Sequence, residues 1–164
     1  MYQARLGHAH LFVRELSRSV RFYTTFLNLR VTESVGERTA FLSSGQLHHE
    51  VALTAIGESA ATPANDSVGL FHLAFDVPSK AEFAEAYRKL MNGGVEVSPV
   101  DHQIGWGMYF RDPDGNMLEI YCDTRLEPDG APQWRGENRE LPASRITAVL
   151  GTQSLEQALD ARAE

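Results

Sequence analysis

The sequence is poor in cysteine, in positive charge and in long apolar runs. Cys122 is the only cysteine among 164 residues, so the chain can form no internal disulfide. Lysine and arginine number 15 against 22 aspartates and glutamates, and the formal net charge of −7 argues against a partner with a phosphate backbone. The N-terminus has neither the charged nor the apolar region of a leader peptide. We therefore expect a cytoplasmic protein that binds neither nucleic acid nor a membrane.

An internal repeat is the most informative pattern that is present. His8 and His72 are 64 positions apart (72 − 8), and further pairs match at the same spacing. Two ungapped segments that share so many positions indicate a duplicated module. Equivalent histidines in such a pair are expected around a pseudo-twofold axis, where one ion could be bound. The further pairs are Leu11 and Phe75, Val13 and Val77, Tyr23 and Tyr87, Asn28 and Asn92, and Val31 and Val95.

The apolar periodicity of each repeat predicts a strand, a helix and three further strands. With 43% hydrophobic residues the chain can build the core of one domain, and the element order predicts an α+β fold. Module one covers about residues 5–56, a linker rich in Gly, Ser, Ala and Pro covers 57–68, and module two covers 69–124. The expected strands are 6–13, 29–33, 38–43, 49–56, 70–77, 95–99, 107–111 and 117–121, and the expected helices follow an N-cap at Ser17 and span 79–91.

Two short segments interrupt or follow this pattern. Residues 112–116, with the sequence Asp-Pro-Asp-Gly-Asn, have the chemistry of a tight turn, because proline presets φ and glycine accepts positive φ. This turn delivers Glu119 onto the last strand. Residues 125–164 form a C-terminal extension that reads as irregular at first, with a short helix over 153–163.

His8, His72 and Glu119 form the natural ligand set for a divalent metal. Two imidazoles and one carboxylate on three strands leave about three coordination positions open, which is typical of catalytic sites. Fe(II) or Mn(II) is favoured over zinc, since structural zinc sites use several cysteines at short spacings. Either histidine alone could equally serve a structural role. His10 faces the same side of the strand as His8 and competes with it, but the register of the repeat favours His8.

The sequence leaves open which residue of the first module corresponds to Glu119. At a spacing of 69 residues (119 − 50), Glu50 matches Glu119 and could be a fourth ligand. At a spacing of 70 (119 − 49), His49 takes that position instead. A one-residue slip reverses which side chain faces the site, and the sequence does not choose between the two registers.

Four sequence segments resemble the vicinal oxygen chelate superfamily, which contains glyoxalases, fosfomycin-modifying enzymes and type I extradiol dioxygenases. They are GHAHL at 7–11, SVRFY at 19–23, FHLAF at 71–75 and YFRDPDGNMLEIY at 109–121, and the resemblance covers about residues 5–124. It implies a single domain at 1–124 in which two tandem βαβββ modules form an open cup-like or barrel-like mixed sheet around one metal site.

Within that superfamily the chain most resembles the extradiol dioxygenases. The segment LHHEVAL at 47–53 is similar to their histidine-containing strand, and Asp101 and His102 precede the Tyr109 strand as in those enzymes. The resemblance implies that His49 acts as an acid or base. Two features depart from the pattern: one pair of modules stands where many such enzymes have two, and Glu50 stands where aspartate is commoner.

The function that this resemblance implies is ring cleavage of a catecholic substrate with O2 by a non-haem Fe(II)-dependent extradiol dioxygenase. His8, His72 and Glu119 would bind the iron, with Mn(II) as the alternative metal, and His102 and Tyr109 would contact the catecholic oxygens. We expect a homo-oligomer, a dimer or larger. A glyoxalase-like metal-dependent lyase, isomerase or transferase is the main alternative, and a metal-free protein that sequesters small molecules is the second.

Overall fold

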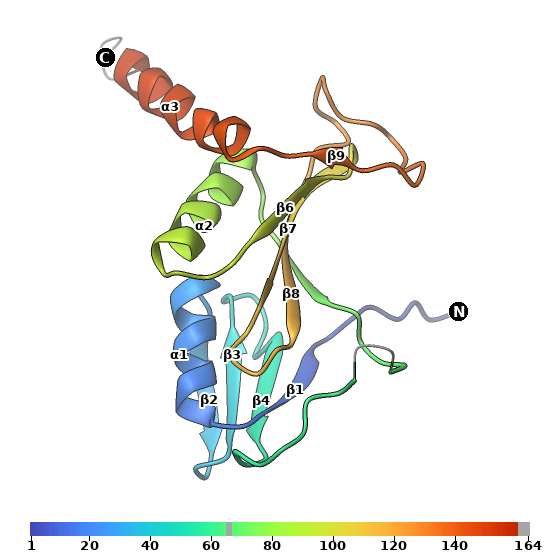
Figure 1. Ribbon diagram of the computed structural model, residues 1–164, viewed down its shortest axis with the longest axis vertical. Coiled ribbons are helices and arrows are strands. Elements are labelled where there is room, and N and C mark those ends of the chain that lie inside the picture. Colours follow the sequence, from blue (N-terminus) through green and yellow to red (C-terminus); the bar gives the residue numbers. More distant parts are fainter. Residues whose placement is uncertain (65–66, 161–164) are drawn as a thin grey trace. The chain divides into compact units, whose positions relative to one another are not determined.

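The computed structural model describes residues 1–64 and 67–160, with the backbone alone over 152–160. The chain divides into two compact units. Unit 1 contains residues 1–70 and 112–116, and unit 2 contains residues 71–111 and 117–164. Each unit combines a mixed β-sheet with helix, so the predicted α+β class is confirmed (Figure 1).

Unit 1 has a four-stranded sheet with α1 (Leu16–Phe26) against one face. The strand order is β1-β4-β3-β2, and β1 runs parallel to β4 while the other neighbours are antiparallel. Tyr23 of the helix is fully buried together with Leu42 and Leu53 of the sheet, which form the core of this unit. The strands are β1 (Ala9–Val13), β2 (Arg30–Val35), β3 (Thr39–Ser43) and β4 (Val51–Ala55).

Unit 2 repeats the same order and adds elements at its C-terminal end. Its sheet has the order β5-β8-β7-β6-β9, with β5 parallel to β8. The helix α2 (Lys80–Asn92) covers one face of the sheet and buries Phe83, and α3 (Ala143–Asp160), which contains the buried Ile146, packs on α2. The strands are β5 (Leu73–Asp76), β6 (Ser98–Asp101), β7 (Gly105–Arg111), β8 (Met117–Asp123) and β9 (Arg139–Glu140).

The strand pairings give the register of the repeat. Ala9 pairs with Val51 in unit 1, and Leu73, 64 positions after Ala9 (73 − 9), pairs with Leu118 in unit 2. Equivalent residues in the last strands of the two modules are therefore 67 positions apart (118 − 51). Because Glu119 follows Leu118 by one residue, its equivalent in unit 1 is Ala52. Neither of the spacings considered from the sequence, 69 and 70, is the one that the sheets adopt.

Both first strands begin later than predicted, and for the same reason. His8 and His72 each lie immediately before their strands, which begin at Ala9 and at Leu73. In both units the pairing of these strands starts after the histidine, at Ala9 with Val51 and at Leu73 with Leu118.

Two helix boundaries also differ from the predictions. Ser17 is not the N-cap of α1, because Glu15 caps the helix and accepts hydrogen bonds from the backbone N–H groups of Ser17 and Arg18. The helix α3 begins ten residues earlier than predicted (153 − 143), because packing of α3 on α2 stabilises a turn that periodicity alone does not mark. The predicted end of that helix, 161–163, lies outside the described residues.

The predicted turn at 112–116 is present and belongs to unit 1. Asp112 accepts hydrogen bonds from the backbone N–H groups of Asp114 and Asn116, which closes the turn. The Tyr23 hydroxyl donates to the other carboxylate oxygen of Asp112 at 3.1 Å. Arg18 forms an ion pair of 2.7 Å with the buried carboxylate of Asp114. The turn is thus held by contacts with α1 as well as by its own internal hydrogen bonds.

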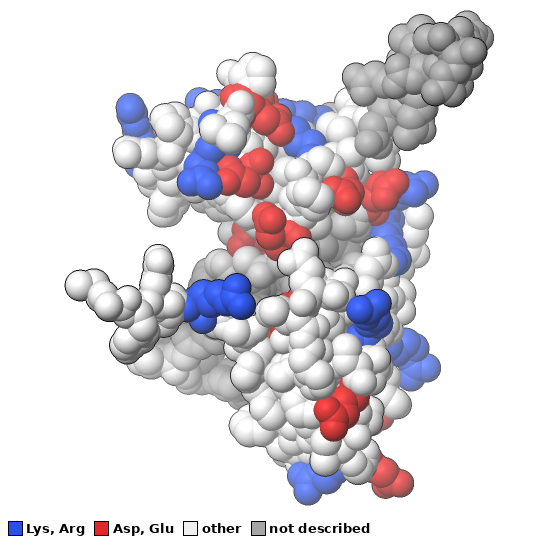
Figure 2. Space-filling model, turned by 180° about the vertical axis from the view of Figure 1, so that it is seen from behind, with Lys and Arg blue, Asp and Glu red and all other residues white. Residues whose placement is uncertain are grey.

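Charges of both signs are mixed on the surface. Lys80 lies beside Glu127 and Asp129, and Arg145 bridges Asp129 and Asp101. On the face drawn in Figure 2, acidic and basic side chains are likewise interspersed rather than separated by sign. Among the described residues, no helix combines the length and the apolar character needed to cross a membrane.

Candidate functional site

His72 and Glu119 form a close pair in unit 2. His72 lies just before β5, and Glu119 lies on the neighbouring strand β8, opposite Ala74. The imidazole Nε2 of His72 is 3.0 Å from Oε2 of Glu119, whose side chain is only 6% exposed. Burying a carboxylate costs free energy unless it has hydrogen-bond or charge partners, so Glu119 depends on the nearby imidazole of His72.

Tyr109 and His102 complete the cluster. Tyr109 on β7 is paired across the sheet with Glu119, and its hydroxyl lies 2.9 Å from Nε2 of His102. The same His102 nitrogen is 3.9 Å from Oε1 of Glu119. Burial raises the pKa of Tyr109 well above its usual value, and the charge of Glu119 raises it further. We call these four residues, His72, His102, Tyr109 and Glu119, the unit 2 cluster.

Gly107 provides the space in which the cluster fits. A Cβ atom at this position would lie 2.5 Å from Oε1 of Glu119 and 3.2 Å from Nε2 of His102. The first distance is far shorter than any van der Waals contact, so a side chain here would displace the carboxylate. A glycine inside a strand commonly marks such a close approach, and this was the available sequence signal.

The His72 and Glu119 pair fits a metal ion. Nδ1 of His72 is buried and has no hydrogen-bond partner among the described residues, which is unusual for a buried polar atom. Two neighbouring ligands of an octahedral ion, each about 2.1 Å from the metal, are about 3.0 Å apart, which agrees with the separation of Nε2 and Oε2. One imidazole and one carboxylate of the predicted set are thus brought together in unit 2.

His8 and His49 lie together in unit 1. Their ring centroids are 4.5 Å apart, and the ring of Phe41 lies 4.8 Å from that of His49. Burial lowers the pKa of His49, and the neighbouring His8 and His48 lower it further. The competing residue, His10, instead hydrogen-bonds Oγ1 of Thr54 at 2.8 Å.

The remaining polar residues at the start of β4 are engaged locally. Glu50 accepts hydrogen bonds from the backbone N–H and the hydroxyl of Ser44, at 2.9 and 2.8 Å. His48 lies 3.2 Å from Glu33, and its Nδ1 lies 2.8 Å from Nδ1 of His49. With Ala52 at the position equivalent to Glu119, Glu50 is part of the β3–β4 connection in this structure.

The predicted metal ligands are therefore divided between the units: His8 belongs to unit 1, and His72 and Glu119 belong to unit 2. Within either unit, the described residues contain no group of three His, Cys, Asp or Glu side chains spaced to hold an ion. The predicted catalytic residues are divided in the same way, with His49 in unit 1 and His102 and Tyr109 in unit 2.

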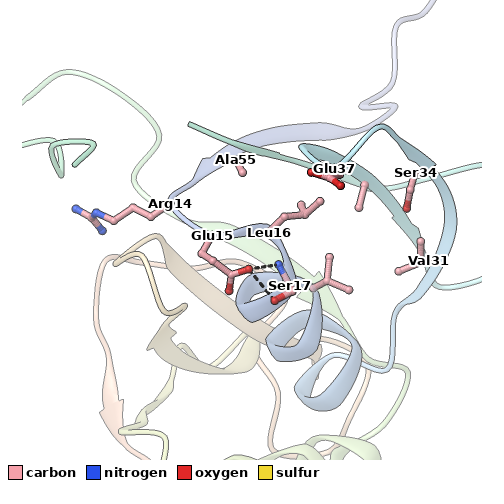
Figure 3. A pocket seen from close by; sticks show the side chains of 10 residues that line it. Arg14, Glu15, Leu16, Ser17, Val31, Ser34, Glu37 and Ala55 are labelled. Atoms are coloured by element: carbon pink, nitrogen blue, oxygen red, sulfur yellow. Dashed lines mark hydrogen bonds between the residues drawn. The ribbon is translucent and has the colours of Figure 1, made fainter. Parts of the chain in front are cut away.

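A cavity of about 370 Å³ in unit 1 is separate from these residues (Figure 3). It lies at the start of α1, and Glu15 turns its carboxylate onto the helix N-terminus at Ser17. The Glu15 carboxylate accepts hydrogen bonds from the N–H groups of Ser17 and Arg18, so it occupies the place at the helix terminus that an anion would take. None of the predicted site residues lines it; its walls are Arg14, Glu15, Leu16, Ser17, Val20, Val31, Ser34, Glu37, Ala40 and Ala55.

Asn138 is a neighbour of the unit 2 cluster that no sequence signal identified. Its Oδ1 lies 2.8 Å from Nδ1 of His102, and the ring of Trp134 meets the His102 ring edge to face at 6.4 Å. Both residues lie in the irregular part of the C-terminal extension, where no periodicity relates them to the site.

Comparisons with known proteins place the chain in a family. Residues 5–120 match the model of the Glyoxalase/Bleomycin resistance protein/Dioxygenase superfamily. Biphenyl-2,3-diol 1,2-dioxygenase 3 of Rhodococcus globerulus is 34% identical over 76% of this chain and 66% of its own length. Catechol-2,3-dioxygenase of Bacillus subtilis is 30% identical over 96% of this chain and 53% of its own length. The chain thus spans between about half and two thirds of these two relatives.

A solved structure agrees with this assignment. The glyoxylase/bleomycin resistance protein/dioxygenase domain from Frankia sp. EAN1pec is 26% identical, with a TM-score of 0.63, over 74% of this chain and 99% of that chain. The duplicated βαβββ units, the motif segments and these matches lead to one conclusion. The chain belongs to the glyoxalase, bleomycin resistance protein and dioxygenase superfamily.

Proposed function

We propose that the chain is an Fe(II)-dependent extradiol dioxygenase that cleaves the ring of a catecholic substrate with O2. The observation that carries the proposal is the unit 2 cluster, where a histidine and a carboxylate of the proposed ligand set lie beside a second histidine and a tyrosine. The two curated relatives named for biphenyl-diol and catechol dioxygenases support the same reaction.

His8, His72 and Glu119 would hold the metal, which in this reading is Fe(II) with Mn(II) as the alternative. When bound, the metal would supply open positions for the two vicinal oxygens of a catechol and for O2. Two protein histidines and one carboxylate leave those positions free of protein groups. The buried carboxylate of Glu119 balances part of the charge of a divalent ion.

The other residues of the site handle protons and orientation. His102 is an imidazole that can accept a phenolic proton at neutral pH, and its Nε2 lies against the Tyr109 hydroxyl. The raised pKa of Tyr109 keeps its hydroxyl protonated, so it can donate a hydrogen bond to a substrate oxygen. His49, whose lowered pKa favours the neutral ring, would act as the second acid or base.

The experiment that tests the proposal is oxygen uptake by protein reconstituted anaerobically with Fe(II). Catechol, 3-methylcatechol and 2,3-dihydroxybiphenyl are the substrates, and a yellow ring-opened product accompanies uptake if the proposal is correct. Protein that binds one metal ion per chain yet consumes no oxygen with any of the three would contradict it.

The glyoxalase-like alternative predicts a different outcome. It favours a fourth protein ligand from module one, but Ala52 occupies the position equivalent to Glu119 and Glu50 is bound to Ser44. Removal of the Glu50 carboxylate in a Glu50→Gln variant should therefore leave metal content unchanged. Loss of metal from this variant would favour the lyase, isomerase or transferase reading, and no metal binding by the wild type would favour a sequestering protein.

A further inference from the structure

We propose that Asn138 is a positioning residue that fixes the tautomer of His102. Its amide oxygen accepts a hydrogen bond from Nδ1–H of His102, which leaves Nε2 without a proton and facing the Tyr109 hydroxyl. The role of this contact in turnover rests on the proposed dioxygenase function, whereas the tautomer itself is a property of the protein alone.

The two ring nitrogens of His102 have different partners. Nδ1 is 2.8 Å from Oδ1 of Asn138, and Nε2 is 2.9 Å from the hydroxyl oxygen of Tyr109. An amide oxygen can only accept a hydrogen bond, so the ring nitrogen facing it must carry the proton. A neutral imidazole has one such proton, and Nε2 is then the basic nitrogen that the site requires.

The segment that carries Asn138 is fixed on both sides of it. Immediately after it, β9 pairs with β6, with Arg139 opposite Asp101 and Glu140 opposite Val100. Immediately before it, the side-chain amide of Gln103 donates to the backbone oxygen of Glu137 at 3.1 Å. These contacts hold Asn138 beside His102, and they do not involve the side chain of Asn138.

Charged contacts attach the rest of the extension to unit 2. Arg145 forms an ion pair of 2.6 Å with the buried carboxylate of Asp101 and one of 2.8 Å with Asp129. The guanidinium of Arg145 also lies 5.0 Å from the centre of the Trp106 ring. Asp101 directly precedes His102, so the extension also holds the residue next to the histidine.

The ring of Trp134 limits the orientation of His102 further. It meets the imidazole edge to face at 6.4 Å and is 53% exposed. Among the described residues, the hydrogen-bond partners of the imidazole are Asn138 at Nδ1 and Tyr109 at Nε2. The extension beyond the residues matched by the family model thus completes the surroundings of a site residue.

The test is the proton position on His102 in metal-free, full-length protein. Long-range proton–nitrogen correlation spectra of protein with labelled histidine report which ring nitrogen is protonated. The spectra are recorded at a pH of about 8.5, and a His102→Gln variant assigns the signals. We expect the wild type to carry the proton on Nδ1.

Three variants separate positioning from a general structural role. Asn138→Ala should shift the ratio of the two tautomers by about tenfold towards Nε2–H, since one hydrogen bond of ordinary strength is lost. Asn138→Asp keeps an oxygen acceptor and should restore Nδ1–H. Glu137→Ala is the matched control, because the substitution keeps the backbone oxygen of Glu137 that accepts the hydrogen bond from Gln103, and it should leave the His102 signals unchanged.

Wild-type protein with the proton on Nε2, or an unchanged ratio in Asn138→Ala, would overturn the proposal. After reconstitution with Fe(II), Asn138→Ala should lower kcat for catechol about tenfold with KM nearly unchanged, and Asn138→Asp should recover most of the loss. If the wild type consumes no oxygen, the proposed function fails while the spectra still decide the role of Asn138.

Discussion

Nε2 of His72 lies 3.0 Å from Oε2 of Glu119, and the parallel pairing of β5 with β8 holds the two residues at that separation. The pairing is built on apolar side chains of β8, such as Leu118 and Ile120, that are buried on the opposite face of the strand. The backbone positions of this pair are therefore set by the strand pairing, and the role of the pair can be tested by removing either partner.

His72→Ala should abolish metal retention while the fold remains intact. The substitution removes one of three proposed ligands and leaves the buried Glu119 carboxylate without its imidazole partner. Metal content after reconstitution and desalting, measured by mass spectrometry, checks this, with circular dichroism to verify the fold. Full metal content together with unchanged turnover would rule out the proposed ligand set.

His10→Ala is the matched control for the ligand assignment in unit 1. His10 hydrogen-bonds Thr54, and the register of the repeat makes it equivalent to Ala74 rather than to His72. We expect this variant to keep its metal, whereas His8→Ala should lose it. Loss of metal from His10→Ala together with retention by His8→Ala would show that His10 is the ligand instead of His8.

His49→Ala should keep its metal but lower turnover by about a hundredfold or more, as expected for the loss of an acid or base. The ring of His49 stacks near His8 without occupying the position equivalent to Glu119. Steady-state oxygen uptake normalised to bound iron separates the two effects. Loss of metal here would point to a different ligand set in unit 1.

Gly107→Ala should weaken metal binding by about ten- to hundredfold, in the range found when residues that orient metal ligands are changed. The added methyl group would lie 2.5 Å from Oε1 of Glu119, so the carboxylate must move. Metal titration of the variant measures the effect. Gly36→Ala provides a comparison, because the Cβ there would meet no atom within 4 Å and would affect only a surface turn with positive φ.

Cys122 should be unreactive in the folded protein. Burial raises the pKa of its thiol to about 11, and the side chain is 1% exposed. At pH 8 about one thiol in a thousand is then ionised, and the reactive form is the thiolate. Reaction with dithiobis(nitrobenzoate) should be slow in buffer and fast in guanidinium chloride. Rapid stoichiometric reaction of folded protein would show that unit 2 opens readily at β8.

Tyr23→Phe should lower stability by about 1 kcal/mol at pH 7, because one buried hydrogen bond to Asp112 is lost. The sign of this difference should reverse in strong alkali. Burial raises the pKa of Tyr23 above its usual value, and the charge of Asp112 adds to this effect. The unfolded chain therefore releases the phenolic proton first, and wild-type stability falls as the pH rises above about 10.

Urea denaturation of the wild type and the phenylalanine variant between neutral pH and pH 11 measures that difference directly. Tyr109 and Tyr121 also have raised pKa values, but both proteins contain them, so their contributions cancel in the comparison. A constant difference across the whole range would contradict the assignment of Tyr23 as a buried, neutral phenol.

The repeat and the order of elements could be predicted from the sequence because each strand and helix has its own periodicity. The register between strands could not. Spacings of 69 and 70 both aligned plausible side chains, whereas the sheets adopt 67 and place Ala52 opposite His10. Register depends on which backbone groups pair across the sheet, and the loops of unequal length between β3 and β4 and between β7 and β8 remove any fixed spacing from the sequence.

Of the candidate site, the sequence identified the four residues of the unit 2 cluster but not what supports them. Gly107 carried a weak signal, as a glycine within a strand. Asn138 carried none, because its role depends on the pairing of β9 with β6, and a two-residue strand has too little periodicity to be recognised. The early start of α3 was missed for a related reason, since its first turn is stabilised by packing on α2.

The turn at residues 112–116 has a consequence for synthesis of the chain. It belongs to unit 1, where the Tyr23 hydroxyl bonds Asp112 and the guanidinium of Arg18 meets Asp114. A ribosome that has completed residues 1–70 has therefore not yet made all of the first compact unit. Until residue 116 has left the exit tunnel, Tyr23 lacks its acceptor, and the first unit is without one of its buried hydrogen bonds.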